Sequence, residues 1–154
     1  MTGNAQANVI VGNSLNNVLN GVAGNDTLTG NAGIDRLIGG TGRDTMTGGT
    51  ENDVFDFNSK SDSGKTAATR DIITDFTHGA DDIDLSTIDA KKGGGNQAFH
   101  FIGKQAFHHQ AGELHFKYSG ANTLVEGDTD GNGKADFQIE LTGHLALTKG
   151  DFIL

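Results

Sequence analysis

A period of nine residues organises the N-terminal part of this sequence. A glycine recurs at every ninth position, as Gly3, Gly12, Gly21, Gly30, Gly39 and Gly48. Five residues after each glycine comes a short side chain that carries oxygen, in the series Asn8, Asn17, Asp26, Asp35, Asp44 and Asp53. Two residues further on, the side chain is apolar, as in Ile10, Leu19, Leu28, Leu37, Met46 and Phe55. Three series that share one period indicate a repeat architecture, because a flexible linker does not need an apolar residue at each ninth position.

Each repeat divides into a turn of six residues and a strand of three. The turn carries glycine because parts of its backbone need a positive φ, which other residues adopt only with strain. In the strand the central apolar side chain points inward. Two repeats complete one coil, so Ile10 stacks on Leu28, and Leu28 stacks on Met46. The pattern therefore predicts an all-β fold built on a flattened, right-handed parallel β-roll with a narrow aliphatic core.

The composition suits a thin core spread along an axis better than one large core. Only 34% of the 154 residues are hydrophobic, and 24 are glycine. Cysteine is absent, which excludes disulfides and thiolate metal sites and leaves a metal bound by other ligands as the obvious staple. We expect no transmembrane segment, because no apolar run is long enough, and no signal peptide, because Met1 leads into polar sequence.

The acidic residues are placed in a way that favours metal binding. The formal net charge is −9, and 16 of the 20 acidic residues are Asp. Six Asp between Asp26 and Asp71 keep the nine-residue phase. Asp is a good loop ligand for hard cations, so this placement favours ligation over general solubility. The same charge argues against nucleic-acid binding, because no basic stripe is present to meet a phosphate backbone.

Residues 3–56 resemble the nonapeptide G-G-x-G-x-D-x-U-x of the RTX (repeats-in-toxin) family, in which stacked turns bind calcium. The resemblance implies that each ion takes carbonyls and the Asp of one repeat together with carbonyls and the Asp of the repeat two further on. Carried over to this sequence, one site comprises Val22, Gly24, Asp26, Gly39, Thr41 and Asp44. A second site comprises Asn31, Gly33, Asp35, Gly48, Thr50 and Asp53. Both pair Asp with Asp and are therefore the best-matched candidates.

The two N-terminal repeats depart from this pattern. Asn8 and Asn17 replace Asp, and Gln6 and Leu15 stand where the fourth-position glycine belongs. An amide oxygen can bind calcium but brings no charge. We therefore expect sites that use Asn8 or Asn17 to be weak or empty.

The Asp phase continues beyond the last glycine of the repeat. Asp62 follows Asp53 by nine residues, and Asp71 follows Asp62 by nine. A similar stretch closes the roll in serralysin-like sequences, so the resemblance implies that Asp62 and Asp71 pair with Asp44 and Asp53 as the last ligands. The alternative is that both are surface residues that share the phase by coincidence. With these ligands we expect about four Ca²⁺ ions, whose charge nearly balances that of the chain.

From residue 72 onward the repeats give way to ordinary strands. Short apolar-bearing runs at 71–76, 82–85 and 137–141, and a clean alternation at 113–118, predict strands. The layout resembles serralysin and epimerase C-terminal modules. We therefore expect two parts, a roll in residues 3–71 and a mainly antiparallel β-sandwich cap in residues 72–154.

One loop in the second part allows two interpretations. The segment from Asp128 to Asp136 begins D-x-D-x-N-G, like the first half of an EF-hand loop, but its twelfth position is Ile139 and its flanks resemble strands. A plain turn between Val125 and Phe137 is therefore favoured over a calcium site.

No catalytic constellation is evident in the sequence. It contains no H-E-x-x-H zinc motif, no G-x-S-x-G motif and no cysteine nucleophile, and its six histidines resemble surface residues of strands. The Asp residues of the roll are assigned to metal. We therefore expect a non-catalytic module.

The two ends of the sequence bear on its biological role. The last residues, Asp151 to Leu154, resemble the C-terminal export signal of RTX proteins that leave the cell through ABC exporters. Gly3 is already in phase close to Met1, which suggests an upstream passenger domain. The resemblance thus implies a secreted, extracellular calcium-binding module that folds on Ca²⁺ outside the cell and supports type I secretion and folding of its passenger.

The alternative function is binding of an anionic, alginate-like polysaccharide along the roll. Such a role needs a basic track, and the candidates in the roll are Arg36, Arg43, Lys60, Lys65 and Arg70. The net charge of the chain opposes this interpretation.

Overall fold

The computed structural model describes residues 1–154 as strands, turns and one short 3-10 helix. The strands of the repeat are β1 (Val9–Val11), β2 (Val18–Asn20), β3 (Thr27–Ala32), β4 (Arg36–Ile38), β5 (Thr45–Thr50) and β6 (Val54–Asp56). They are followed by β7 (Asp71–Ile73), β8 (Asp82–Asp84), β9 (His100–Phe101), β10 (Glu113–Ser119), β11 (Asn122–Asp128), β12 (Phe137–Leu141), the helix η1 (Lys149–Asp151) and β13 (Phe152–Ile153). No helical segment has the length and apolar character needed to cross a bilayer.

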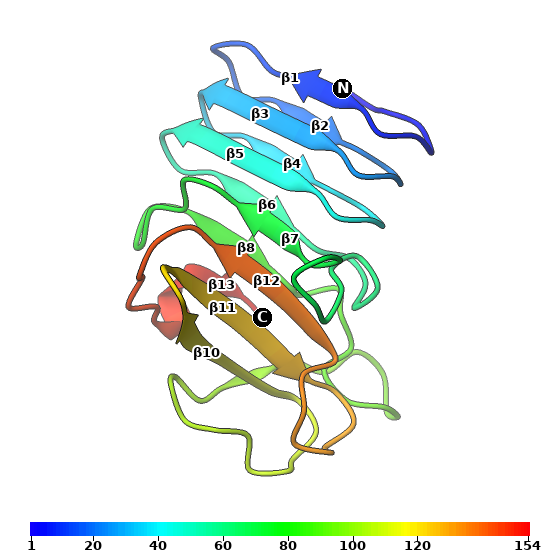
Figure 1. Cartoon of the computed structure of the whole chain (residues 1–154), viewed down its shortest axis with the longest axis vertical. Helices are drawn as coiled ribbons and strands as arrows, with labels where there is room; N and C mark the ends of the chain where they lie inside the picture. The colour runs from blue at the N-terminus through cyan, green and yellow to red at the C-terminus, as the bar shows by residue number, and fades with distance from the viewer.

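The strands form two sheets that lie one in front of the other along the length of the molecule (Figure 1). One sheet has the strand order β1-β3-β5-β7-β12-β11-β10-β9, and the other has the order β13-β8-β6-β4-β2. Strands of alternate repeats pair in parallel, with Ile10 beside Leu28 and Leu28 beside Met46. This register is the coil of two repeats that the nine-residue period predicts. The fold is therefore a parallel β-roll.

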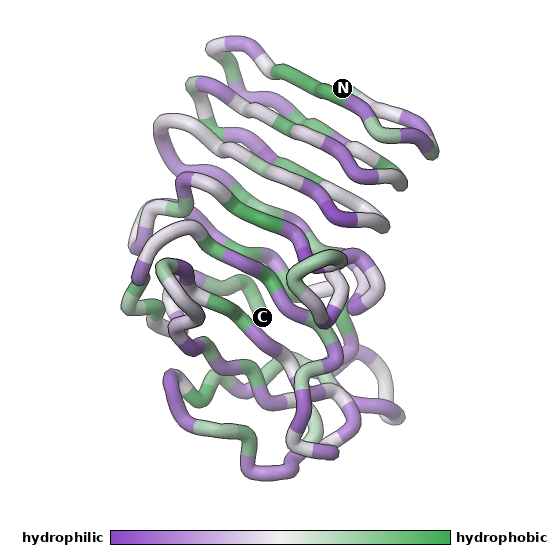
Figure 2. The backbone as a smooth tube through the Cα atoms, viewed as in Figure 1, coloured by the Kyte–Doolittle hydropathy of each residue, from purple (hydrophilic) through white to green (hydrophobic).

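The core of the roll is one side chain wide on each sheet. Leu19, Leu28, Leu37, Met46 and Phe55 have no exposed surface, and burial of each such side chain stabilises the fold by about 1.5–3 kcal/mol. The apolar stretches follow the strands in Figure 2. A single cluster of 22 buried residues extends from the first repeat to Phe152, so the roll and the C-terminal part share one core.

The turns of the middle repeats have a left-handed backbone at their second and fourth positions. In the turn 21–26 these positions are Val22 and Gly24, with φ of 82° and 113°. In the turn 39–44 both are glycine, and a Cβ added to Gly42 would lie 1.8 Å from the carbonyl oxygen of Gly24 in the turn beside it. Close stacking of turns therefore requires glycine at this place. The turns 3–8 and 12–17, which lack the fourth-position glycine, have no residue with positive φ.

The parallel strand pairing of the roll continues without a break across the domain boundary expected between residues 71 and 72. β7 pairs in parallel with β5, and β8 pairs in parallel with β6. β12 then pairs in parallel with β7, and β13 pairs in parallel with β8. Antiparallel pairing occurs only among β10, β11 and β12, which close the lower end of the molecule in Figure 1.

Candidate calcium-binding sites

Along one edge of the roll, polar residues from the turns 3–8, 21–26 and 39–44 and from the start of β7 stack in a first column. The column consists of Asn8, Asp26, Asp44 and Asp71. The N–H of Asn8 donates to Oδ1 of Asp26 at 2.7 Å, the N–H of Asp26 donates to Oδ1 of Asp44 at 2.7 Å, and the N–H of Asp44 donates to Oδ1 of Asp71 at 2.7 Å. One oxygen of each carboxylate thus accepts a hydrogen bond from the backbone of the neighbouring turn.

A second column runs along the other edge and repeats this arrangement. It consists of Asn17, Asp35, Asp53 and Asp81. The N–H of Asp35 donates to Oδ1 of Asp53 at 2.9 Å, and the N–H of Asp53 donates to Oδ1 of Asp81 at 3.0 Å. The two columns together hold six Asp, all buried.

The second oxygen of most of these carboxylates has no partner within the protein. Oδ2 is buried and free of hydrogen bonds on Asp26, Asp35, Asp44, Asp53 and Asp71. Buried polar groups almost always have a partner, and an unpaired buried carboxylate is costly. A row of such atoms is the signature of a cation-binding site, so the residues fit calcium.

Backbone carbonyls converge on the same oxygens. The position of a Cβ on Gly21 would lie 2.3 Å from Oδ2 of Asp26 and 2.5 Å from the carbonyl oxygen of Gly39 in the adjacent turn. On the other edge, a Cβ on Gly30 would lie 2.3 Å from Oδ2 of Asp35 and 2.5 Å from the carbonyl oxygen of Gly48. The first-position glycine therefore leaves open the place where a carboxylate and a carbonyl meet. Calcium prefers such sets of hard oxygen ligands.

The other carbonyls expected as ligands lie in turns that stack in register. The N–H of Gly24 donates to the carbonyl of Thr41 at 2.9 Å, and the N–H of Thr41 donates to the carbonyl of Val22 at 3.2 Å. On the second edge the register places Asn31 beside Gly49 and Ala32 beside Thr50, and the N–H of Gly33 donates to the carboxylate of Glu51. The structure thus stacks the two halves of each expected six-residue site against each other.

The electrostatics of the columns disfavour full ionisation without a cation. Burial, with a smaller effect from neighbouring carboxylates, raises the pKa of Asp44 to about 6 and the pKa of Asp53 to about 6. Burial also raises the pKa of Asp71 to about 9, and the charges of Asp44 and Asp62 act in the same direction. A divalent cation among these groups reverses this balance by favouring the charged carboxylates.

The N-terminal ends of the columns differ from the middle. The amide Oδ1 of Asn8 accepts the N–H of Asn4 at 2.7 Å, and the amide Oδ1 of Asn17 accepts the N–H of Asn13 at 2.7 Å. Both amide oxygens are therefore engaged inside their own turn, unlike the free Oδ2 atoms lower in the columns. This is in line with weaker sites at Asn8 and Asn17.

At the C-terminal ends, the pairing of Asp71 with Asp53 that the nine-residue phase predicted does not occur. Asp71 lies on Asp44 instead, because the loop between β6 and β7 lengthens this coil to 27 residues. Asp62 lies in that loop, where its Oδ2 accepts the N–H groups of Asn58 and Ser59 at 2.9 Å each. Its charge acts on both Asp44 and Asp71, which places it at the end of the first column.

Sequence reasoning missed Asp81, which occupies the last place in the second column. It follows Asp53 by 28 residues and so falls outside the nine-residue phase. A local signal was present nonetheless. In every repeat the column residue stands two positions before the inward apolar residue, and Asp81 stands two before the buried Ile83. Asp75 was also missed, and it accepts the N–H groups of Gly48 and Gly49 at 3.0 and 2.8 Å.

The loop between β11 and β12 is a hydrogen-bonded turn. Asp128 accepts the N–H groups of Asp130, Gly131 and Gly133, and Asp136 accepts the N–H of Thr129. One oxygen from each of the three Asp lies within 4.8 Å of the others. The oxygens of these three Asp are occupied by donors of the loop itself and, on Asp136, also by Lys65, which distinguishes this cluster from the columns.

Three of the five basic residues that a polysaccharide track would need are paired with acids. Arg36 pairs with Asp56 at 2.9 Å and with Asp84 at 3.1 Å on the five-stranded sheet. Arg70 pairs with Glu140 of β12, which belongs to the eight-stranded sheet. Lys65 pairs with Asp136 at 3.3 Å. These side chains neutralise nearby acids on different faces of the molecule.

Comparisons with known proteins identify the family and the fold of the chain. The model of the family described as the C terminus of serralysin, peptidase family M10, matches residues 3–154. The solution structure of the AlgE6R3 subunit of mannuronan C5-epimerase from Azotobacter vinelandii has 26% identity and a TM-score of 0.69, with 98% of this chain and 80% of that chain covered. The AlgE6R2 subunit of the same epimerase has 31% identity and a TM-score of 0.64, with 94% of this chain and 91% of that chain covered. A comparison with curated proteins found no match.

All of these matches are to modules of larger proteins, which is consistent with a non-catalytic module. The family match spans the roll and the cap together, and the structural matches are RTX-repeat modules. The chain therefore belongs to the serralysin C-terminal family of RTX-type calcium-binding modules.

Proposed function

We propose that this chain binds about four Ca²⁺ ions between successive Asp residues of the two columns and folds when it does so. The carboxylates of Asp26, Asp44 and Asp71 hold the ions of the first column, and Asp62 contributes at its end. The carboxylates of Asp35, Asp53 and Asp81 hold those of the second. The observation that carries this proposal is the row of buried carboxylate oxygens without partners.

Calcium supplies the positive charge that these columns lack. The chain carries a net charge of −9, and its buried Asp repel one another when no cation is present. The columns also contribute few side-chain contacts of their own, since the carboxylates of the column Asp accept hydrogen bonds only from backbone N–H groups. Ion binding and stacking of the turns are therefore one event.

Calcium is scarce in the cytosol and abundant outside the cell, so such a module stays extended until it is exported. We therefore propose that it is secreted, and that it supports type I secretion and folding of an upstream passenger. Its C-terminal tail supplies the export address and, after folding, the strand β13. Phe152 of this strand is buried, whereas Ile153 is 39% exposed.

The test of calcium-dependent folding is circular dichroism of the chain in EGTA and then in millimolar Ca²⁺, with Mg²⁺ as the matched control. We expect β-structure and a cooperative melting transition only with Ca²⁺, with affinities of about 10⁻⁴–10⁻³ M as in extracellular modules. A native-like spectrum in EGTA would overturn the proposal.

Export is tested separately, with the chain fused behind a reporter in a bacterium that has an RTX-type ABC exporter. We expect Ile153→Ser to lower secretion while leaving the melting temperature in Ca²⁺ unchanged, because the side chain is outside the core. If a fusion without residues 151–154 reaches the medium as efficiently as the full chain, the tail serves only as a strand of the fold and not as an export signal.

Binding of an anionic polysaccharide along the roll is less well supported. The matched structures come from a mannuronan epimerase. Three of the five basic residues that such a track needs, Arg36, Lys65 and Arg70, are instead paired with Asp and Glu on separate faces.

A further inference from the structure

Glu51 stands at a place in the repeat where the preceding turns have glycine. It is the fourth residue of the turn 48–53, and the fourth residues of the three turns before it are Gly24, Gly33 and Gly42. The φ of Glu51 is 76°, in the left-handed region that favours glycine and strains other residues. Strained residues of this kind gather at ligand sites, so the side chain of Glu51 is a candidate for a role there.

The carboxylate of Glu51 joins two turns of the second column. It reaches from the turn 48–53 to the turn 30–35, where it accepts the N–H of Gly33. In the first column the equivalent N–H, that of Gly24, donates to the carbonyl of Thr41 at 2.9 Å. No side chain fits there, because a Cβ added to Gly42 would lie 1.8 Å from the carbonyl oxygen of Gly24. The second column therefore has a carboxylate where the first column has only backbone.

The charge of Glu51 acts on the candidate calcium ligands of the second column. Burial is the main cause of the raised pKa of Asp35, and the negative charge of Glu51 adds to it, against the N–H of Asn17. Oδ2 of Asp35 is buried without a partner, as is Oδ2 of Asp53 in the same turn as Glu51. Glu51 itself is exposed and so lies at the rim of this site. A rim carboxylate that repels these Asp attracts a cation that binds between them.

The other charges beside the columns increase the difference between them. Asp75 accepts two N–H groups of the turn 48–53, and its charge acts on two Asp of the second column. Asp62 acts in the same way on two Asp of the first column. The first column also has a cation beside it, because the guanidinium of Arg43 favours the ionised form of Asp71 against the larger effect of burial. The second column thus has five carboxyl groups, and the first has four carboxyl groups and one guanidinium.

From these contacts we propose that the second column binds Ca²⁺ ahead of the first, and that Glu51 sets this order by adding a carboxylate to the site between the turns 30–35 and 48–53. Additional carboxylates tighten a calcium site, whereas a fixed cation competes with the ion. The inference rests on the proposed calcium function and goes beyond it, because the module then loads in two stages. It responds to calcium over a wider range of concentration than one class of site allows.

The test follows the backbone N–H groups that bridge the turns of each column. Those of Asp26 and Asp44 report on the first column, and those of Asp35 and Asp53 report on the second. Their hydrogen exchange is measured by NMR on the isotope-labelled, Ca²⁺-loaded protein, in calcium buffers of stepwise lower free Ca²⁺. We expect the first pair to lose protection at a free Ca²⁺ concentration about 3- to 10-fold higher than the second pair.

The variant Glu51→Gln separates the charge of this side chain from its hydrogen bond. An amide oxygen can still accept the N–H of Gly33, but it brings no charge. We expect the second column of this variant to lose protection at a free Ca²⁺ concentration about 2- to 5-fold higher than in the parent chain, as for loss of one exposed charge. The value for the first column is expected to change less, so the two columns come closer together.

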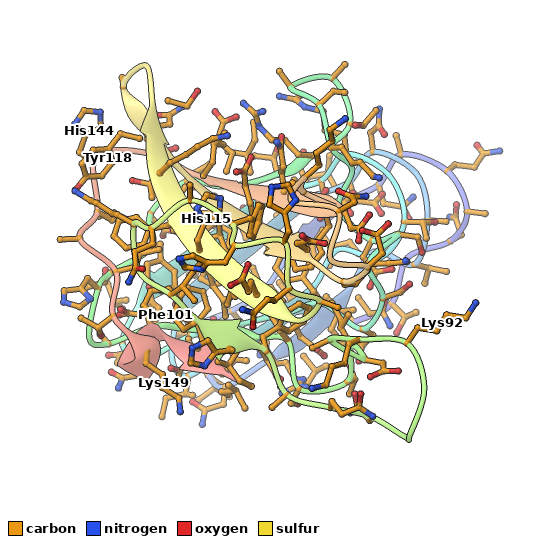
Figure 3. The ribbon with its side chains drawn as sticks, turned by 90° about the horizontal axis from the view of Figure 1, so that it is seen from below. Lys92, Phe101, His115, Tyr118, His144 and Lys149 are labelled. Atoms are coloured by element: carbon orange, nitrogen blue, oxygen red, sulfur yellow. The ribbon has the colours of Figure 1, made fainter.

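The variant Arg43→Gln tests the opposing cation. We expect it to lower, by about the same factor, the free Ca²⁺ concentration at which the first column loses protection. Lys92→Gln is the matched control, because it also removes one positive charge. Lys92 is exposed on an outlying loop, with its side chain toward solvent (Figure 3). The control is expected to leave both columns as they are in the parent chain.

Three outcomes would overturn the inference. They are loss of protection in both columns at one Ca²⁺ concentration, earlier loss in the second column, and an unchanged interval between the columns in Glu51→Gln. The melting temperature in saturating Ca²⁺ identifies a variant that does not fold, and the order in the parent chain tests the inference without any variant. Protection that persists in EGTA contradicts calcium-dependent folding instead, so the two proposals fail in different observations.

Discussion

Asp44 illustrates how one residue of a column serves two neighbours. Its carboxylate accepts the N–H of Asp26, while its own N–H donates to Asp71. It has no exposed surface, and its Oδ2 has no partner within the protein. Asn8, at the end of the same column, is partly exposed and brings no charge. The two positions therefore offer a matched comparison.

We expect Asp44→Ala to lower the stability of the Ca²⁺-loaded protein by about 2 kcal/mol or more, because two calcium sites lose a ligand and the stabilisation that bound ions supply by mass action. Asn8→Ala is expected to have an effect within about 0.5 kcal/mol. Thermal melting at several Ca²⁺ concentrations measures both. Equal losses in the two variants would show that Asp44 is not shared between ions.

At this scale the sequence predicted the column members inside the repeat and also Asp71 beyond it, but it gave Asp71 the wrong partner and missed Asp81. Within residues 3–56 one period fixes both the coil and the position of each Asp, so Asp26, Asp35, Asp44 and Asp53 follow directly. Beyond Asp53 the loops have unequal lengths, and counting by nine placed Asp71 on the wrong partner. The two-residue spacing from each column Asp to the inward apolar residue is the more reliable sequence signal, because it is set locally at one strand and does not depend on loop length.

At the scale of the single turn, Val22 shows a local conflict between residue and backbone. Its φ of 82° lies in the left-handed region, which is unfavourable for a β-branched side chain, and later turns have Gly40 and Gly49 at the equivalent place. The side chain is 43% exposed, so it contributes little to the core. Its carbonyl, the group expected to bind calcium, does not depend on the side chain.

We therefore expect Val22→Gly to stabilise the Ca²⁺-loaded fold by about 1 kcal/mol through relief of backbone strain. Val18→Gly is the matched control. Val18 is also exposed but belongs to the extended strand β2, where glycine costs about 0.5–1 kcal/mol. Chemical denaturation in Ca²⁺ gives both values, and a loss of stability in Val22→Gly would contradict the strain assigned to this turn.

The terminal strand β13 is anchored by Asp151, the residue before it, and by its own first residue, Phe152. Asp151 has no exposed surface and accepts the N–H groups of Thr148 and Gly79 at 2.6 and 2.9 Å. Phe152 pairs with Ile83 of β8, and its ring lies 5.1 Å from that of Phe101. The tail therefore completes the five-stranded sheet.

We expect Phe152→Ala to lower the free energy of unfolding in Ca²⁺ by about 3 kcal/mol, because a buried aromatic side chain leaves a cavity. Ile153→Ala, at the next position but largely outside the core, is expected to cost less than about 1 kcal/mol. Urea denaturation of both variants is the measurement. If the two losses are alike, the tail contributes through its backbone pairing alone.

For the molecule as a whole, the proposed function predicts that the two columns couple compactness to calcium. A folded chain of this length has a radius of gyration of about 15 Å if spherical, somewhat more for an elongated roll, and about 41 Å when unfolded. We expect small-angle scattering to give a value near the first figure in millimolar Ca²⁺ and a much larger one in EGTA. A radius of gyration that does not change on removal of calcium would show that compactness does not depend on the ions.

The architecture of the cap was less predictable than that of the roll. Alternation at 113–118 and the run at 137–141 correctly located strands β10 and β12. No local pattern in either segment indicates that β12 pairs in parallel with β7, because this contact joins residues far apart in the sequence. The antiparallel strands extend the sheet of the roll, and a periodic signal cannot reveal a junction that occurs only once.

The junction between β7 and β12 also has a kinetic consequence. It joins Ile73 to Leu141, a sequence separation of 68 residues, whereas each coil of the repeat joins residues 18 apart, as Leu28 and Met46. Loop-closure entropy grows with separation, and distant contacts slow folding. We expect closure of this junction to limit the rate, after which the coils add in sequence from β7 towards β1, each templated on the one before. The molecule then has a built-in direction of assembly, from its C-terminal half to its N-terminus.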